Sequence, residues 1–174
     1  MATHDVSIRG IQQGDEKKLL EMMYALQSHL ERSNPRIWRI TDEGRRQILE
    51  QVKGAIRSDG KLLVAEIGGK TVGFAAARVS KRADFKPATV GFIERVFMCE
   101  EHRRRGIATQ LVHAICDYFT ENGVEEVNLQ YVRGNREAEG FWGSLGFTPV
   151  LETASTDLDG LLYKIHSEYV FSCF

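Results

Sequence analysis

Three consecutive arginines followed by a glycine are the residues whose types and spacing are best suited to chemistry. Arg103, Arg104 and Arg105 precede Gly106, and the pattern of a helix begins immediately afterwards. The start of a helix presents backbone N–H groups without intrahelical partners, at the positive end of the helix dipole. Gly106 and Ala108 keep bulky side chains away, so an anion can approach those amides directly. The pattern indicates a phosphate or diphosphate site; a solvated arginine run beside an ordinary helix start is the alternative.

The familiar nucleotide-binding loops are absent from this sequence. It has no GxxxxGK(S/T) segment and no GxGxxG after a first strand, which excludes P-loop and Rossmann sites. The three cysteines, Cys99, Cys116 and Cys173, form no CxxC pair, so we expect reduced thiols and no metal site. Cys99 has no adjacent base that would maintain a thiolate, and we expect it to be a spectator rather than a nucleophile.

Two helices and several strands are predicted before the arginines. Apolar residues recur every three or four positions over residues 15–33 and 41–56, which is typical of amphipathic helices. Pro35 ends the first helix, because proline disfavours helical geometry in the residue before it. Thr41 or Asp42 caps the second helix. Strands are expected at residues 6–9, 62–67, 71–80 and 89–98.

The second half of the chain alternates helices and strands. The helix that begins near Gly106 ends at Asn122-Gly123, and a strand at 125–132 and a helix at 135–145 follow. A final pair of strands is expected between Gly146 and Ile165. The order predicts a single α/β domain over residues 1–174, with a mixed central sheet of about seven strands flanked by about four helices.

Composition excludes several classes of partner. The 174 residues contain 23 Lys and Arg against 24 Asp and Glu, and a net charge of −1 argues against a nucleic-acid-binding protein. No aromatic residues are interleaved with the arginines, which disfavours RNA binding there. The sequence has no apolar run of about 20 residues that would span a membrane and no secretory signal at its start. We therefore expect a cytoplasmic protein.

Two motifs resemble those of the GNAT superfamily of N-acetyltransferases. The segment Arg103-x-x-Gly106-x-Ala108 is similar to the superfamily pattern Q/R-x-x-G-x-G/A, and it lies between a predicted strand and a long helix. A second pattern, N-x-x-A-x-x-F-Y-x-x-x-G-F, is similar to Asn135-x-x-Ala138-x-x-Phe141-Trp142-x-x-Leu145-Gly146-Phe147. The two motifs follow in the correct order, and the resemblance is close over the expected cofactor-binding core, residues 89–150.

The resemblance implies a GNAT-like fold, acetyl-CoA as cosubstrate without a metal, and an amine acceptor. The matched strand would bind the pantetheine arm through its backbone, at Val96, Phe97 and Met98. The matched loop and helix start would hold the pyrophosphate, at Arg103, Arg104, Arg105, Gly106, Ile107, Ala108 and Thr109. Asn135 and Phe141 would contact the cofactor, and the Met98 amide would polarise the thioester carbonyl.

Glu94 is the candidate general base. An alkylammonium with a pKa near 10.4 must lose a proton before it attacks, so a base is valuable. Glu94 lies four residues before Met98, and strand alternation would place it on the face of Val96 and Met98. Members of the superfamily often carry a catalytic glutamate at this offset. The alternative is that Glu94 pairs with a cation on the sheet; Glu100, Glu101 and His102 are weaker candidates for the base.

The sequence departs from the superfamily pattern at Trp142, where a tyrosine usually protonates the departing thiolate. An indole N–H donates a hydrogen bond but no useful proton, so either Tyr131 or Tyr163 takes over or the thiolate leaves unassisted. Glu100 and Arg104 replace a common proline and glycine. Aromatic packing is the alternative role of Trp142.

The predicted function is acetyl-CoA-dependent transfer of an acetyl group to an amine of a small molecule or peptide by direct attack. A non-catalytic acyl-CoA-binding sensor with the same fold is the alternative. The acceptor, the acyl-chain preference and homodimer formation stay open. Side chains that could line an acceptor cleft are Tyr24, His29, Trp38, Asp84, Asp157 and Asp159.

Overall fold

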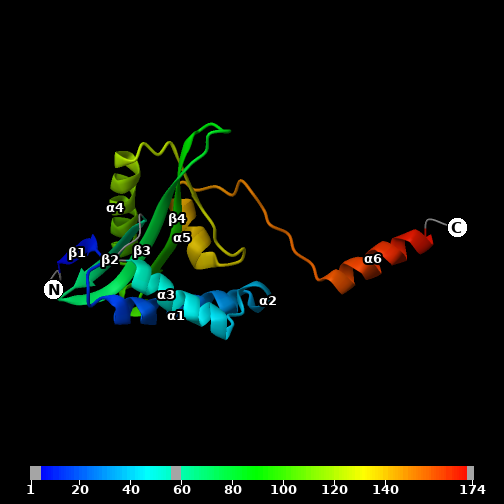
Figure 1. Cartoon of the computed structure of the whole chain (residues 1–174), viewed down its shortest axis with the longest axis horizontal. Coiled ribbons are helices and arrows are strands. Elements are labelled where there is room, and N and C mark those ends of the chain that lie inside the picture. Colours follow the sequence, from blue (N-terminus) through cyan, green and yellow to red (C-terminus); the bar gives the residue numbers. More distant parts are fainter. Residues whose placement is uncertain (1–4, 56–59, 172–174) are drawn as a thin grey trace. The chain divides into compact units, whose positions relative to one another are not determined.

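A computed structural model describes residues 5–55 and 60–171, which fall into two compact units, Met1–Asn135 and Arg136–Phe174. Ile56, at the end of a predicted helix, and Cys173 lie outside the described residues. The first unit contains the sheet, and the second contains two helices (Figure 1). That the whole chain forms one domain stays a prediction.

Five strands form the sheet of the first unit, in the order β1-β2-β3-β4-β5. The first four strands pair with one another antiparallel, and β5 pairs with β4 in parallel. Gly68 and Gly69, with φ of 55° and 75°, make the turn between β2 and β3, a conformation that glycine adopts at little cost. The strands are β1 Val6–Gly10, β2 Lys61–Ile67, β3 Lys70–Lys81, β4 Thr89–Met98 and β5 Glu126–Leu129.

The described part of the first unit contains four α-helices, and their ends follow the local sequence. Pro35 occupies the first turn of α2, directly after α1 has ended, and the Thr41 hydroxyl accepts a hydrogen bond from the Gly44 N–H at 3.1 Å as the cap of α3. Both features were predicted from the sequence. The helices are α1 Glu16–Ser33, α2 Pro35–Trp38, α3 Asp42–Ala55 and α4 Ile107–Glu121, with a short 3-10 helix at Glu100–His102.

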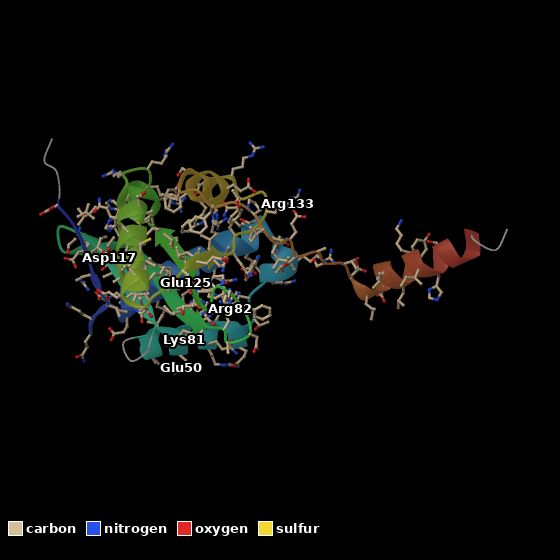
Figure 2. All side chains as sticks on the ribbon, turned by 90° about the horizontal axis from the view of Figure 1, so that it is seen from above. Glu50, Lys81, Arg82, Asp117, Glu125 and Arg133 are labelled. Atoms are coloured by element: carbon tan, nitrogen blue, oxygen red, sulfur yellow. The ribbon has the colours of Figure 1, made fainter. Side chains whose placement is uncertain are left out.

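The helices cover both faces of the sheet. Successive strand residues point to opposite faces, and both faces carry apolar side chains that the helices bury. Phe74 packs on the face of α1 and α3 in a buried cluster with Leu19 and Val52. On the opposite face the Phe119 ring of α4 lies over Gly91, where a Cβ atom would come within 2.7 Å of it. Figure 1 shows α4 on one side of the sheet, and Figure 2 labels Asp117 on α4 and Glu50 on α3 on opposite sides of it.

The predicted final pair of strands is wrong. Residues 148–157 have no regular structure, and the second unit contains α5 Arg136–Ser144 and α6 Leu158–Phe171. Asp157 Oδ1 accepts a hydrogen bond from the Gly160 N–H at 2.6 Å, which is typical of a helix N-terminus. The sheet therefore has five strands rather than about seven, and the described residues contain six α-helices rather than about four.

Candidate functional site

The site begins where β4 and β5 separate. Their parallel pairing runs only from Val90 opposite Glu126 to Ile93 opposite Leu129, whereas β4 continues to Met98 beside β3. A register irregularity between Ala76 and Ala77 of β3 leaves one extra residue, Glu94, on β4 at the point of separation. Such a bulge bends a strand and increases its twist. The segment from Glu94 to Met98 therefore has one edge that β5 does not cover.

The hydrogen bonds of β4 show which of its amides face this open edge. The Cys99 N–H donates to the Val72 carbonyl at 2.8 Å, toward β3. Because successive residues in a ladder direct their backbone groups to opposite sides, Val96 and Met98 point theirs to the open edge. The Met98 carbonyl accordingly accepts a hydrogen bond from Nε of Arg103 at 3.2 Å. The same alternation directs the Phe97 amide toward β3. Of the three residues predicted to bind the pantetheine arm through their backbone, only Val96 and Met98 therefore have amides at the open edge.

The start of α4 follows directly, after a loop in an unusual backbone conformation. Gly106, the residue before the helix, has a φ of 75°, and Arg104 has a φ of 57°. The first backbone bond of the helix runs from the Gln110 N–H to the Gly106 carbonyl at 3.2 Å. The amides from Gly106 to Thr109 therefore precede the helical ladder. Within the described residues no side chain caps this end.

The side chains around the helix start leave these amides accessible. Ile107 is buried and anchors the helix on the sheet, whereas Arg104, Arg105 and Thr109 are exposed. A Cβ atom added at Gly106 would meet nothing within 4 Å. The structure thus brings together the open edge of β4 and an uncapped helix start with exposed arginines, an arrangement suited to an extended chain that ends in a diphosphate.

Glu94 lies beside the open edge and is held by Arg78. Its Oε1 accepts a hydrogen bond from Nε of Arg78 at 2.9 Å, and the Arg78 guanidinium lies 4.2 Å from the centre of the Phe92 ring. The side chain of Glu94 is 42% exposed. Because Glu94 is the bulged residue, the predicted common face with Val96 and Met98 does not follow from strand alternation. Glu94 does pair with a cation on the sheet, and its role as the base stays a prediction.

Sequence reasoning missed Arg78. The residue is 16 positions from Glu94 in the chain, and only the β3–β4 register brings the two side chains together. The available signal was that β3 carries an arginine within its otherwise apolar stretch from Val72 to Val79.

Asn135, the last residue of the first unit, lies against α1. Its Nδ2 atom is 3.3 Å from Nε2 of His29. His29 was predicted to line the acceptor cleft, and this contact places α1 beside the segment that follows β5. Tyr131, a candidate acid, is half-buried in the same segment.

The remaining residues of the second motif belong to the second unit. Phe141 and Trp142 lie on α5 with their ring centres 4.8 Å apart, and Trp142 meets Phe147 at 5.4 Å, both edge to face. Trp142 thus packs with its aromatic neighbours, as the alternative for this residue predicted. Tyr163, the other candidate acid, is 72% exposed on α6.

The other candidate acceptor residues are dispersed. The Tyr24 hydroxyl donates to the Arg45 carbonyl at 3.3 Å, and the Trp38 carbonyl accepts from Gln27 at 2.6 Å. Asp84 lies between β3 and β4, and Asp157 and Asp159 lie in the second unit. The structure therefore does not bring these six residues into one cleft of the first unit.

Neither thiol chemistry nor a metal is supported by the local geometry. Burial raises the pKa of the Cys99 thiol above its usual range, so the thiol stays protonated at neutral pH. The described part of the chain contains no group of three His, Cys, Asp or Glu side chains placed to hold a metal ion. It also contains no helix that is both long enough and apolar enough to cross a membrane.

Comparisons with known proteins agree with this geometry. The sequence model of the Acetyltransferase (GNAT) family matches residues 23–147. An uncharacterized N-acetyltransferase of Bacillus subtilis, YobR, is 32% identical over 62 residues, which are 36% of this chain and 25% of that protein. An uncharacterized N-acetyltransferase of Archaeoglobus fulgidus is 32% identical over 88 residues, 51% of this chain and 60% of that protein. The chain thus spans between a quarter and three fifths of these relatives.

One solved structure illustrates the likeness of the fold. The aminoglycoside N-acetyltransferase AAC(6')-Iy, in complex with CoA, superposes with a TM-score of 0.64 at 22% identity and covers 88% of this chain and 94% of that one. At this identity the likeness concerns the fold.

Proposed function

The chain belongs to the acetyltransferase (GNAT) family, and from this premise we propose that it transfers an acetyl group from acetyl-CoA to an amine of a small molecule or a peptide. The observation that carries the proposal is the open edge of β4 beside the uncapped start of α4. The pantetheine arm would add to β4 as an extended chain, through the amides of Val96 and Met98. The diphosphate would bind the amides from Gly106 to Thr109, with Arg104 and Arg105 adding positive charge.

Glu94 would supply the base for direct attack. At pH 7 only about one alkylamine in two or three thousand is neutral, so deprotonation costs on the order of 4 to 5 kcal/mol. Glu94 would accept the ammonium proton, directly or through a water, and the amine nitrogen would then bond to the thioester carbon. The Met98 N–H, which faces the open edge, would stabilise the negative charge that develops on the carbonyl oxygen.

The departing thiolate needs little assistance in this scheme. As the carbon–sulfur bond breaks, the nitrogen would lose its second proton and the sulfur would gain one, with Tyr131 or water passing the proton between them. A thiol has a pKa of about 8.5, so the thiolate is a tolerable leaving group without the usual tyrosine. Trp142 contributes packing to the second unit rather than a proton.

A second candidate is a non-catalytic acyl-CoA sensor. Trp142 favours it, because an indole stands where the family pattern has its acid. Incubation of the whole chain with acetyl-CoA and a panel of amines, with free CoA thiol followed over time, distinguishes the candidates. We expect thiol release that depends on an amine. Cofactor binding without release for any amine would favour the sensor, and absence of binding would contradict both.

A further inference from the structure

A small cavity lies between α1, α3 and the separated part of β4. Its volume is about 180 Å³, and it is lined on one side by aliphatic residues such as Leu26 and Ile48. The other side is polar, with Arg95 of β4 facing Gln47 and Gln51 of α3. None of the described residues that line this cavity is acidic. The cavity thus combines an aliphatic wall with a cation that has no carboxylate beside it.

Arg95 is half-buried, and its hydrogen-bond partner is a neutral side chain. Its Nη2 atom donates to Oε1 of Gln51 at 3.2 Å, and among the described residues no carboxylate lies within ion-pair distance of it. Another cavity of the first unit, of about 470 Å³, differs because Asp15 and Glu101 accompany Lys18 there. Arginine binds carboxylates through paired, charge-assisted hydrogen bonds. The Arg95 guanidinium is therefore able to bind an anionic group in this cavity.

This cavity is adjacent to the proposed reaction centre. Arg95 directly follows Glu94 and precedes Val96, whose amide faces the open edge of β4. The register places Arg95 opposite Ala76 and Phe97 opposite Phe74, so both side chains lie on the face covered by α1 and α3. A ligand bound at Arg95 can thus reach the Glu94 carboxylate along a single strand.

We propose that the acceptor is an amine that carries a carboxylate on a short aliphatic chain. The inference rests on the proposed acetyl transfer and names its substrate class. The carboxylate binds Arg95 and the glutamine amides, the chain lies against Leu26 and Ile48, and the ammonium lies toward Glu94. The guanidinium would repel a polycation, so the site disfavours polyamines and aminoglycosides.

Binding of a carboxylate without an amine tests the cavity independently of catalysis. Pentanoate is titrated calorimetrically into the whole chain in the presence of CoA, with pentanamide as the uncharged comparison. We expect pentanoate to bind about tenfold or more tightly than pentanamide, because a charge-assisted hydrogen bond is lost in the amide. Arg95→Gln should remove this preference and Arg95→Lys should retain part of it. Arg46→Gln, on an exposed arginine of α3 paired with Glu43, should change nothing.

The matching activity test compares 5-aminopentanoate with pentylamine by thiol release. We expect kcat/KM to favour the amino acid about tenfold or more in the wild-type chain, and the ratio to approach one in Arg95→Gln. Equal binding of pentanoate and pentanamide, or a preference that survives Arg95→Gln in a variant of unchanged thermal midpoint, would overturn the proposal. Failure of acetyl-CoA to bind would instead contradict the proposed function, and a separate titration measures it.

Discussion

At the residue scale, the pairing of Glu94 with Arg78 determines how the carboxylate is presented. Both side chains are more than 40% exposed, so the ion pair contributes little to the stability of the fold. The ion pair instead fixes the position of the Glu94 carboxylate, since the Arg78 guanidinium is itself held over the Phe92 ring. The sequence identified Glu94 as a candidate base. The orientation of its side chain could not be predicted, because the bulge at Glu94 depends on the register with the partner strand β3.

Replacement of Glu94 by Gln should lower kcat by about 10²- to 10⁴-fold, because the amide accepts no proton. Acetyl-CoA affinity should stay unchanged, since Glu94 does not belong to the surfaces proposed to hold the cofactor. Steady-state thiol release and calorimetry measure the two quantities. Glu50→Gln, on an exposed residue of α3 paired with Lys53, is the control. A Glu94→Gln variant with wild-type kcat would show that another group is the base.

At the element scale, the separation of β4 from β5 and the start of α4 form the site together. The sequence predicted β1 to β4 and α4 well, because apolar periodicity and glycine turns are local signals. It predicted β5 over 125–132, but the strand ends at Leu129, where its pairing with β4 stops. The final strands were also wrong, although Leu158, Leu161, Leu162 and Ile165 have helical spacing. Strand length and register depend on the partner, which a single sequence does not reveal.

The close packing of α4 on the sheet is testable at Gly91. In Gly91→Ala the new methyl group would lie 2.7 Å from the Phe119 ring, so α4 or the ring must shift. We expect the free energy of unfolding to fall by about 1 to 3 kcal/mol, with weaker acetyl-CoA binding as α4 moves. Urea denaturation measures the first effect. Gly10→Ala, at a glycine with nothing within 4 Å of its Cβ position, is the control; equal stabilities of the two variants would contradict this packing.

At the scale of the whole molecule, one network ties the edge of the sheet to the first helix. Arg9 of β1 bonds Asp15, the residue before α1, at 2.7 Å and Glu66 of β2 at 2.8 Å. The hydrogen bond from Arg9 holds the pKa of Asp15 below its usual value. A carboxylate with a lowered pKa stabilises the fold above its unfolded pKa of about 4, and this contribution is lost as the pH falls through the folded pKa.

The network predicts a pH-dependent difference between Asp15→Asn and the wild type. At pH 7 the variant should unfold with a free energy lower by about 1 to 2 kcal/mol, because a partly buried, charge-assisted contact is lost. Below about pH 4 the difference should shrink, since the wild-type carboxylate then takes a proton. Urea denaturation at a series of pH values measures it. A difference that stays constant down to pH 3 would show that Asp15 acts through something other than its charge.

The central claim is that the amides at the start of α4 bind the diphosphate of acetyl-CoA, and calorimetric titration of the wild-type chain and Gly106→Glu tests it most directly. The substitution places bulk and negative charge at a position that is now open and that has a φ of 75°. Gly140→Glu, at an exposed glycine of α5, is a charge-matched control. We predict saturable binding by the wild type and the control, and none by Gly106→Glu. Wild-type affinity in a folded Gly106→Glu variant would contradict the account.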